Sequence, residues 1–169
     1  ILEKYEALLL ESKPDATIVI GDINSTVACA LATVKLGIPL IISEFGACMD
    51  SAECVTEIDQ VTGVADKHLN GWAYWEFKTY KDLTTSAGTR SEGFYNFDGT
   101  IQSPKVKALS RSYVKAAQGT TKSMNFDTKT GNFEAVVQLD LSIEKPTLIH
   151  AHQGATTNLA WYPLGYNVT

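Results

Sequence analysis

The sequence predicts an α/β fold, in which parallel strands alternate with helices and a small antiparallel β-sandwich follows. Two continuous apolar runs, residues 16–20 and 38–42, are rich in β-branched side chains, as is typical of strands buried on both faces. Helical patterns lie before and between these runs, which implies parallel pairing with right-handed crossovers. From Thr120 onward apolar and polar residues alternate, which is typical of antiparallel strands.

Each element of the α/β region has a local signal. Apolar side chains at helical spacing predict a helix over residues 1–13. A second helix over residues 27–35 lies between the two apolar strands, and Gly37 is suited to end it. A third helix is expected at about residues 51–66, and the aromatic run at residues 71–77 predicts the next strand.

Residues 78–103 have no clear periodicity and predict a long loop, which in a compact domain often has a function. A helix from Pro104 to about residue 117 follows. We place a boundary near Thr120, between an α/β region (residues 1–119) and a C-terminal β-sandwich module (residues 120–169). In that module DTKTGN predicts a turn between two strands, and PTLIHAHQ, LAWYP and YNVT predict further short strands.

The composition excludes several classes of partner. The 169 residues carry a net charge of −5 at pH 7, so we expect no nucleic acid or anionic membrane as partner, since both require a basic surface. No apolar run is long enough to predict an integral membrane span. No GxGxxG or Walker motif occurs, and we expect no cofactor.

We expect no metal site either. Cys29, Cys48 and Cys54 match no zinc-binding spacing. They are suited to be small buried side chains, and a disulfide between two of them would leave one free thiol. His150 and His152 face the same side of a predicted strand, but no third ligand accompanies them.

The most informative motif is ISEFGA, in which Glu44 directly follows a predicted buried strand. Phe45 and Gly46 predict a turn there. In barrel-like α/β folds, the edge formed by the carboxyl ends of the strands carries the chemistry. Glu44 is therefore a candidate catalytic carboxylate. The alternative is that it caps a neighbouring element or pairs with a cation.

The next strand supplies the aromatic residues Trp72, Tyr74 and Trp75. Alternation along the strand puts Trp72 and Trp75 on opposite faces. A tryptophan at a strand end offers a flat apolar platform for the C–H face of a sugar ring. Trp75 lies nearer the end and is the better candidate, whereas Trp72 is better explained by core packing.

These residues carry a resemblance to a known family. GIPLIISEFGAC, GWAYWEFKTYKDLTTS and SEGFYNFDGTIQSPKVKALSRSYVKAAQGTTKSMNFD resemble, in this order and spacing, the C-terminal part of endoglycoceramidases of glycoside hydrolase family 5, over about residues 37–169. The resemblance implies that residues 43–119 are the last strands and helices of a (β/α)8 barrel, followed by the β-sandwich. It also implies that Glu44 is the nucleophile and that Trp75 and Tyr74 contact the substrate.

The activity implied by this resemblance is retaining hydrolysis of glycosphingolipids or related β-glucosides, a reaction of glycosphingolipid catabolism. The implied partner is a glycan or glycolipid, and the implied location is secreted or lysosomal. Retaining hydrolysis also needs an acid/base carboxyl about 5–5.5 Å from the nucleophile. In the family this Glu follows an Asn upstream, and no Asn-Glu dipeptide occurs in residues 1–43. We therefore expect an incomplete hydrolase, and its open sheet edges predict self-association.

The N-terminal part resembles a different family. KPDATIVIGDINSTVACALATVKLGIPL is similar to a segment of non-hydrolysing UDP-N-acetylglucosamine 2-epimerases, and the resemblance covers residues 1–46, with residues 1–42 as the epimerase-like segment. It implies that Asp22 and Glu44 are catalytic residues of an enzyme that binds UDP or its sugar conjugate. A non-catalytic fusion product, in which the β module only supports or binds, is the third alternative.

Overall fold

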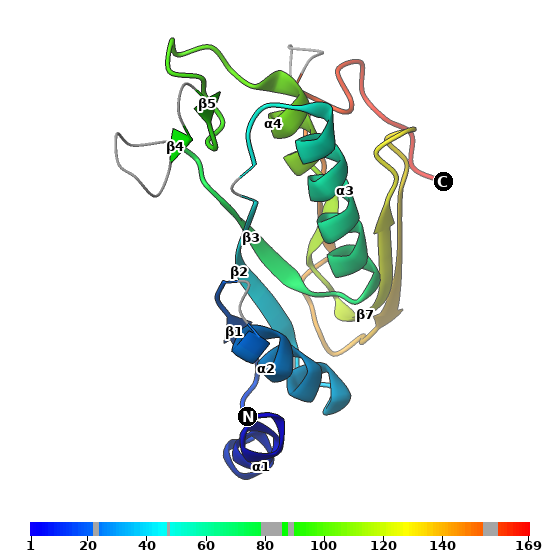
Figure 1. Cartoon of the computed structure of the whole chain (residues 1–169). Coiled ribbons are helices and arrows are strands. Elements are labelled where there is room, and N and C mark those ends of the chain that lie inside the picture. The colour runs from blue at the N-terminus through cyan, green and yellow to red at the C-terminus, as the bar shows by residue number, and fades with distance from the viewer. Residues whose placement is uncertain (22–23, 47, 79–85, 88–89, 154–158) are drawn as a thin grey trace.

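The structure is a computed structural model that describes residues 1–21, 24–46, 48–78, 86–87, 90–153 and 159–169 (Figure 1). The helices in these ranges are α1 (Leu2–Ser12), α2 (Asn24–Lys35), α3 (Ala52–Lys67) and α4 (Ser103–Leu109). The strands are β1 (Thr17–Val19), β2 (Leu40–Gly46), β3 (Gly71–Trp75), β4 (Ser86–Ala87), β5 (Arg90–Ser91), β6 (Tyr113–Ala116), β7 (Gly119–Phe126), β8 (Phe133–Leu139) and β9 (Leu148–His150). None of the described helices is both long enough and apolar enough to cross a membrane.

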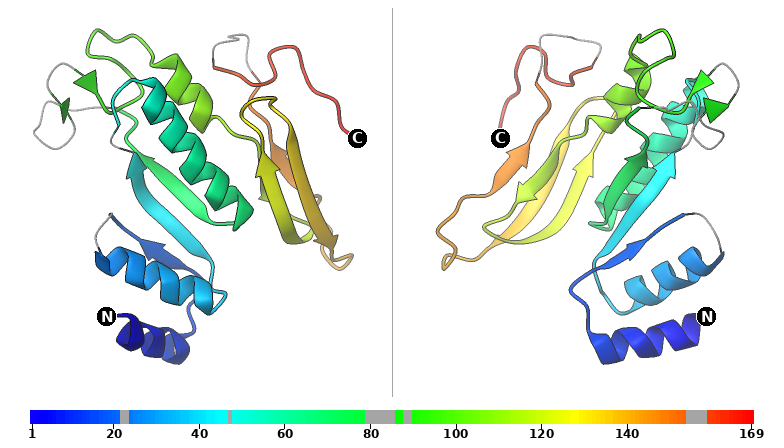
Figure 2. Two further views of the ribbon diagram at one scale, coloured as in Figure 1. Left: turned by 45° about the vertical axis from the view of Figure 1, so that its right-hand side comes forward. Right: turned by 90° about the vertical axis from the view of Figure 1, so that its left-hand side faces the viewer.

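Strands β1, β2 and β3 form a parallel sheet in that order. Ile18 lies beside Ile41, and Ile42 lies beside Trp72. Helices α2 and α3 connect the successive strands. Because both crossovers step in the same direction across the sheet, right-handed connections place both helices on one face, which can be followed in Figure 2. The predicted fold class, with parallel strands and helices before antiparallel sheets, is confirmed.

The two faces of the parallel sheet differ in burial. Thr17, Val19 and Leu40 point towards the helices and are buried. On the other face, Ile18 is 62% exposed and Ile20, just beyond β1, is 66% exposed. Among the described elements, those that pack on β1 are α2 and β2. We call the side that carries Ile18 the open face.

The core of the α/β region lies on the helix-covered face. Cys54 and Ile58 of α3 are buried beside α4, and Phe45 and Tyr74 pack against them. Helix α3 begins where the sequence predicts, because the Ser51 hydroxyl accepts a hydrogen bond from the Cys54 N–H at 3.1 Å. This core holds the carboxyl ends of β2 and β3 in place.

A disulfide links the segment after β2 to the first turn of α3. It joins Cys48 to Cys54, and Cys29 is a half-buried free thiol. Of the alternatives that the sequence left open, the structure has the disulfide with one cysteine left over. The disulfide lies beside the core and restricts the conformations of the chain between β2 and α3.

A buried lysine joins three segments of this region. The fully buried Lys105 donates hydrogen bonds to the carbonyl oxygens of Cys48 at 2.8 Å, Glu92 at 3.2 Å and Gly93 at 3.3 Å. Burial disfavours the charged ammonium and lowers the pKa of Lys105 to about 8, although the Asp50 and Glu92 charges oppose this shift. The side chain thus satisfies backbone groups that have moved away from water.

The predicted helix from Pro104 to about residue 117 is wrong in its second half. Helix α4 ends at Leu109, and residues 113–116 form β6, which pairs antiparallel with β9. The β-branched Val114 favours a strand, and the pairing partner lies far along the chain, where helical periodicity cannot reveal it. Antiparallel pairing therefore starts before Thr120, and a boundary near that residue stays a prediction.

The C-terminal module consists of two antiparallel sheets, β6–β9 and β7–β8. Strands β7 and β8 are joined by the predicted DTKTGN turn, in which the Gly131 N–H donates to the Asp127 carbonyl at 2.7 Å. The segments LAWYP and YNVT form no strand, contrary to prediction. Instead Trp161 packs its ring edge-to-face on Phe126, with centroids 5.2 Å apart, so apolar packing replaces a strand ladder there.

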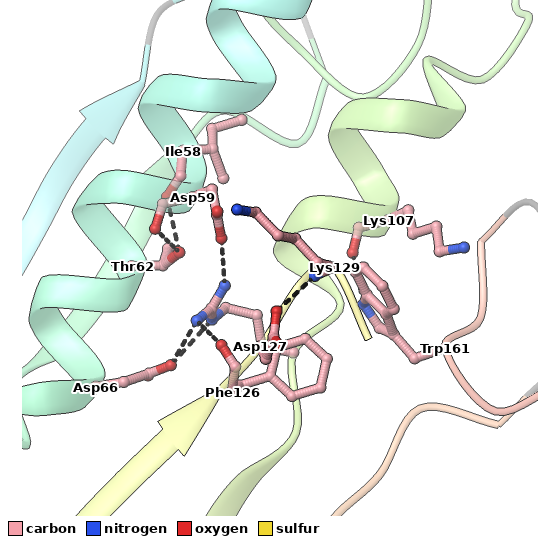
Figure 3. A network of polar contacts seen from close by, with 10 residues as sticks. Ile58, Asp59, Thr62, Asp66, Lys107, Phe126, Asp127, Lys129 and Trp161 are labelled. Atoms are coloured by element: carbon pink, nitrogen blue, oxygen red, sulfur yellow. Dashed lines mark hydrogen bonds and ion pairs between the residues drawn. The ribbon is translucent and has the colours of Figure 1, made fainter. Parts of the chain in front are cut away.

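One buried arginine connects the module to α3 (Figure 3). Arg111 Nε and Nη2 donate to Asp66 Oδ2 at 3.0 and 2.7 Å, Nη1 donates to Asp59 Oδ1 at 3.1 Å, and Nη2 also donates to the Phe126 carbonyl at 3.0 Å. Burial raises the pKa of Asp66, and Arg111 opposes that rise. The guanidinium also lies over the Phe126 ring, 5.1 Å from its centroid.

Candidate functional site

Glu44 lies near the carboxyl end of the central parallel strand. Strand β2 runs through Leu40–Gly46, so the predicted turn at Phe45 and Gly46 is wrong. Gly46 still pairs with Trp75 of β3. The strand continues because β3 offers it a partner edge, which local turn signals do not take into account. Glu44 is therefore inside the ladder, not beyond its end.

A β-bulge changes the direction of the chain at this point. The register between β2 and β3 shifts between Ile42 and Phe45. Ser43 and Glu44 therefore lie together opposite one residue of β3, Ala73. Bulges direct side chains away from the regular alternation and occur often next to active sites.

Strand alternation assigns Glu44 and Trp75 to the open face, because their neighbours Phe45 and Tyr74 lie on the other one. The rings of Phe45 and Tyr74 lie on the helix-covered face, with centroids 5.6 Å apart. Alternation therefore turns Trp75 away from α3, and it is 40% exposed. Glu44 is exposed too, and within the described part of the chain no hydrogen bond or ion pair engages its carboxylate. An accessible carboxylate and an aromatic platform thus occupy the same end and the same face of the sheet.

Gly46 is required for this arrangement. Its φ of +113° is a conformation that L side chains rarely adopt. A Cβ at this position would also overlap the Tyr74 ring, because it would lie 2.6 Å from Cδ2 and closer still to Cε2. The glycine two residues after Glu44 therefore lets the end of β2 lie against the Tyr74 ring.

Tyr74 belongs to the packing beneath the site. Its hydroxyl donates to the Glu92 carbonyl at 3.0 Å. Burial, reinforced by the negative charge of Glu92, raises the pKa of Tyr74, so the phenol stays neutral. Because it lies on the face opposite to Trp75, Tyr74 as a substrate contact stays a prediction.

An aromatic cluster next to β3 was missed by sequence reasoning. Phe77 is 63% exposed and contacts the rings of Phe94 and Tyr95, at centroid distances of 5.6 and 5.7 Å. The Phe94 N–H donates to the Phe77 carbonyl at 3.0 Å. The aromatic residues within the predicted loop, residues 78–103, were the signal that could have revealed it. Of that loop, residues 79–85 and 88–89 lie outside the described ranges.

Asp22, the second candidate catalytic residue, lies outside the described residues. Close to it in the chain, the Thr26 hydroxyl donates to the Ile20 carbonyl at 2.8 Å, which joins the first turn of α2 to the end of β1. The structure therefore places Glu44 and Trp75 at the same end of the sheet and does not test Asp22.

The two histidines of the β module have separate structural partners. His150 stacks on Tyr113 with ring centroids 4.9 Å apart, and His152 Nδ1 lies 3.0 Å from the Leu159 carbonyl oxygen. Among the residues that the structure describes, no group of three or more His, Cys, Asp or Glu side chains could hold a metal ion.

The chain is similar in sequence to curated epimerases. No known family profile matches it. It is 27% identical to a UDP-N-acetylglucosamine 2-epimerase homolog of Methanococcus maripaludis over 159 residues, which are 94% of this chain and 39% of that protein. It is 28% identical over 155 residues to a UDP-N-acetylglucosamine 2-epimerase of the same organism, covering 85% of this chain and 42% of that protein. The chain thus spans about two fifths of these relatives, and the similarity extends beyond residues 1–46.

The chain is similar in structure to glycoside hydrolases. Endo-glycoceramidase II from Rhodococcus sp. superposes with a TM-score of 0.52 and 25% identity, over 73% of this chain and 26% of that protein. Sterylglucosidase 1 of Cryptococcus neoformans superposes with a TM-score of 0.55 over 80% of this chain and 25% of that one, and at 16% identity this shows the fold alone. The two predicted resemblances are thus both confirmed: the chain is similar to part of a barrel glycoside hydrolase in structure and to part of an epimerase in sequence.

Proposed function

We propose that Glu44 is the nucleophile of a retaining glycoside hydrolase that acts on glycosphingolipids or related β-glucosides. The observation that carries the proposal is the position of Glu44. Its carboxylate is exposed at a bulge, at the carboxyl end of the central parallel strand, on the same face as Trp75. In barrel enzymes this end of the strands holds the catalytic groups.

The chemistry follows from an accessible carboxylate. Glu44 would attack the anomeric carbon, and the bond from that carbon to the aglycone oxygen would break as the glycosyl ester forms. Water would then cleave the ester and return the carboxylate. A lactosyl-enzyme intermediate of the Rhodococcus endo-glycoceramidase II is among the similar structures, at 25% identity. Trp75 would support the sugar ring beside the attacked carbon.

The leaving oxygen needs a proton, and Glu44 cannot supply it while acting as nucleophile. A second carboxyl, about 5–5.5 Å away in retaining enzymes, has that role. Since the chain spans about a quarter of the similar glycosidase structures, the proposal assigns to it the nucleophile and the Trp75 platform. Substrates with leaving groups that depart without protonation therefore provide the appropriate test.

The test is covalent trapping with 2,4-dinitrophenyl 2-deoxy-2-fluoro-β-glucoside, whose leaving group needs no acid catalyst. Intact mass should increase by one fluoroglucosyl group, and fragmentation should locate it on Glu44. Glu44→Gln should remove the adduct, whereas Glu57→Gln, at an exposed position of α3, should retain it. No adduct on folded protein, or an adduct that persists in Glu44→Gln, would refute the assignment.

A second candidate is supported by the sequence similarity to epimerases over 94% of the chain. In this alternative Asp22 and Glu44 would act on a UDP-linked N-acetyl sugar. Calorimetry with UDP distinguishes the two candidates. Heat that saturates with UDP and disappears in Asp22→Asn would favour the epimerase, and no heat at millimolar UDP would remove it.

A further inference from the structure

A cavity lies at the end of the parallel sheet opposite to Glu44. It has a volume of about 580 Å³ and is enclosed by the α3–β3 connection, the start of β3 and strands β6 and β7. This volume is within the range of about 300–1,000 Å³ that is usual for small-molecule sites. The cavity lies between the α/β region and the β module, and it has no connection with the candidate chemistry of Glu44.

The walls of this cavity combine flat apolar surfaces with a few polar groups. Trp72, Tyr113 and Met124 supply apolar surface, and Asn70 and Thr121 lie among them. Trp72 is held in place by an edge-to-face contact with Phe45, at 5.8 Å between centroids. The indole is therefore a fixed surface that a ligand can pack against.

The polar groups in the wall have unused hydrogen-bonding capacity. The Asn70 backbone N–H donates to the Ala65 carbonyl at 2.8 Å. Within the described residues, the Asn70 side-chain amide and the Thr121 hydroxyl make no hydrogen bond. Asp66 receives both Arg111 bonds on Oδ2, which leaves Oδ1 as an acceptor. Three donor hydrogens, two on Asn70 and one on Thr121, and several acceptors thus line one apolar pocket.

We propose that this cavity is a second carbohydrate-binding site, which takes one or two pyranose rings of a neutral sugar. A pyranose has an apolar C–H face, suited to Trp72 and Tyr113, and a rim of hydroxyl groups, suited to Asn70 and Asp66. A purely apolar ligand would displace water from these polar groups and leave them without partners, which is costly. This proposal does not depend on Glu44 being a nucleophile.

We propose a neutral sugar because the cavity wall has, among the residues described, no cation free to pair with a charged ligand. Arg111 is the cation in the wall, and its three nitrogens are engaged by Asp66, Asp59 and the Phe126 carbonyl. A carboxylate or phosphate ligand would instead lie beside the Asp66 carboxylate without a partner of opposite charge. Neutral glycans such as lactose and cellobiose are the appropriate probes.

The experiment is saturation-transfer NMR and calorimetry with lactose on the 169-residue chain. We expect millimolar binding that weakens about fivefold in Asn70→Ala, as the loss of one hydrogen bond predicts. Thr121→Val, which keeps the side-chain shape, should weaken it as well. Glu57→Gln, at an exposed position of α3 outside the cavity wall, should leave this affinity within about twofold. Asn70 and Thr121 are half-buried positions, and circular dichroism verifies that each variant is folded.

Three results would overturn the proposal. The first is no lactose or cellobiose binding at tens of millimolar on folded protein. The second is binding that Trp75→Ala removes and Asn70→Ala retains, which would place the sugar at the Glu44 end. The third is that hexanol binds and neither sugar does, which would make the cavity an apolar site. A fluoroglucosyl adduct on Glu44 could still form in each case, so the two proposals fail independently.

Discussion

The replacement of Arg111 by methionine tests how the β module is held. Methionine keeps much of the aliphatic length and removes the guanidinium that bonds Asp66, Asp59 and the Phe126 carbonyl. The Asp66 side chain is only 5% exposed, so water reaches its carboxylate only from the adjoining cavity and cannot replace all of the lost N–H groups.

The expected loss is large because a buried charge loses its partner. Removing one member of a buried ion pair costs about 3–5 kcal/mol. Asp59 adds little, because its side chain is 40% exposed and water solvates it. We therefore expect the unfolding free energy to fall by about 4 kcal/mol, against about 5–15 kcal/mol for a typical domain.

Urea denaturation followed by circular dichroism measures this loss, and Lys35→Met is the matched control. The Lys35–Glu6 pair is nearly as short as the Arg111–Asp66 pair, at 2.8 Å against 2.7 Å, but Lys35 is 67% exposed. Its loss should therefore cost at most about 1 kcal/mol. The pH dependence of the stability loss in Arg111→Met provides a second test. In Arg111→Met, burial still raises the pKa of Asp66 and the opposing attraction is gone. The folded state then binds more protons than the unfolded state, so the loss should shrink as pH falls through the folded pKa.

A double-mutant cycle tests whether the unpaired Asp66 charge causes the loss of stability. Arg111→Met combined with Asp66→Asn should cost clearly less than the sum of the two single changes, because the unpaired charge is absent from the double variant. A loss of stability in Arg111→Met no larger than that in Lys35→Met, or additive effects of the two single changes, would refute the buried-charge explanation.

Three further predictions concern the end of the sheet and its surroundings. Gly46→Ala should lower the unfolding free energy by about 2–4 kcal/mol, because backbone strain adds to overlap with Tyr74. Gly37 also has a positive φ but no neighbouring atoms, so Gly37→Ala should lose only the part due to backbone strain in the same urea denaturation experiment. Because burial lowers the pKa of Lys105 to about 8, the folded state loses its proton before the unfolded state does. Stability should therefore rise between about pH 8 and 10, by roughly 1 kcal/mol per unit, whereas Lys105→Met should show no such rise. The exposed Ile18 on the open face predicts concentration-dependent self-association, and sedimentation velocity should show Ile18→Lys to be more monomeric. A monomeric parent chain at all concentrations would contradict this.

Local signals predicted most elements of the fold. Helical spacing located α1 and α3, and β-branched runs located β1 and β2, because each signal acts within a few residues. The prediction failed at residues 113–116, which become β6 only because β9 lies beside them. It failed again at LAWYP, where Trp161 packs on Phe126 instead of pairing as a strand.

The sequence by itself determined that Glu44 and Trp75 come at the ends of neighbouring parallel strands, because strand order and crossover direction follow from the pattern of elements. Only the tertiary structure decided that the two side chains share one exposed face, because that depends on the register and the bulge between β2 and β3. The tertiary structure also decided the partners of Arg111 and Lys105 and the cavity beside Trp72. These features join groups that lie far apart in the chain, and packing in three dimensions, not local periodicity, brings such groups together.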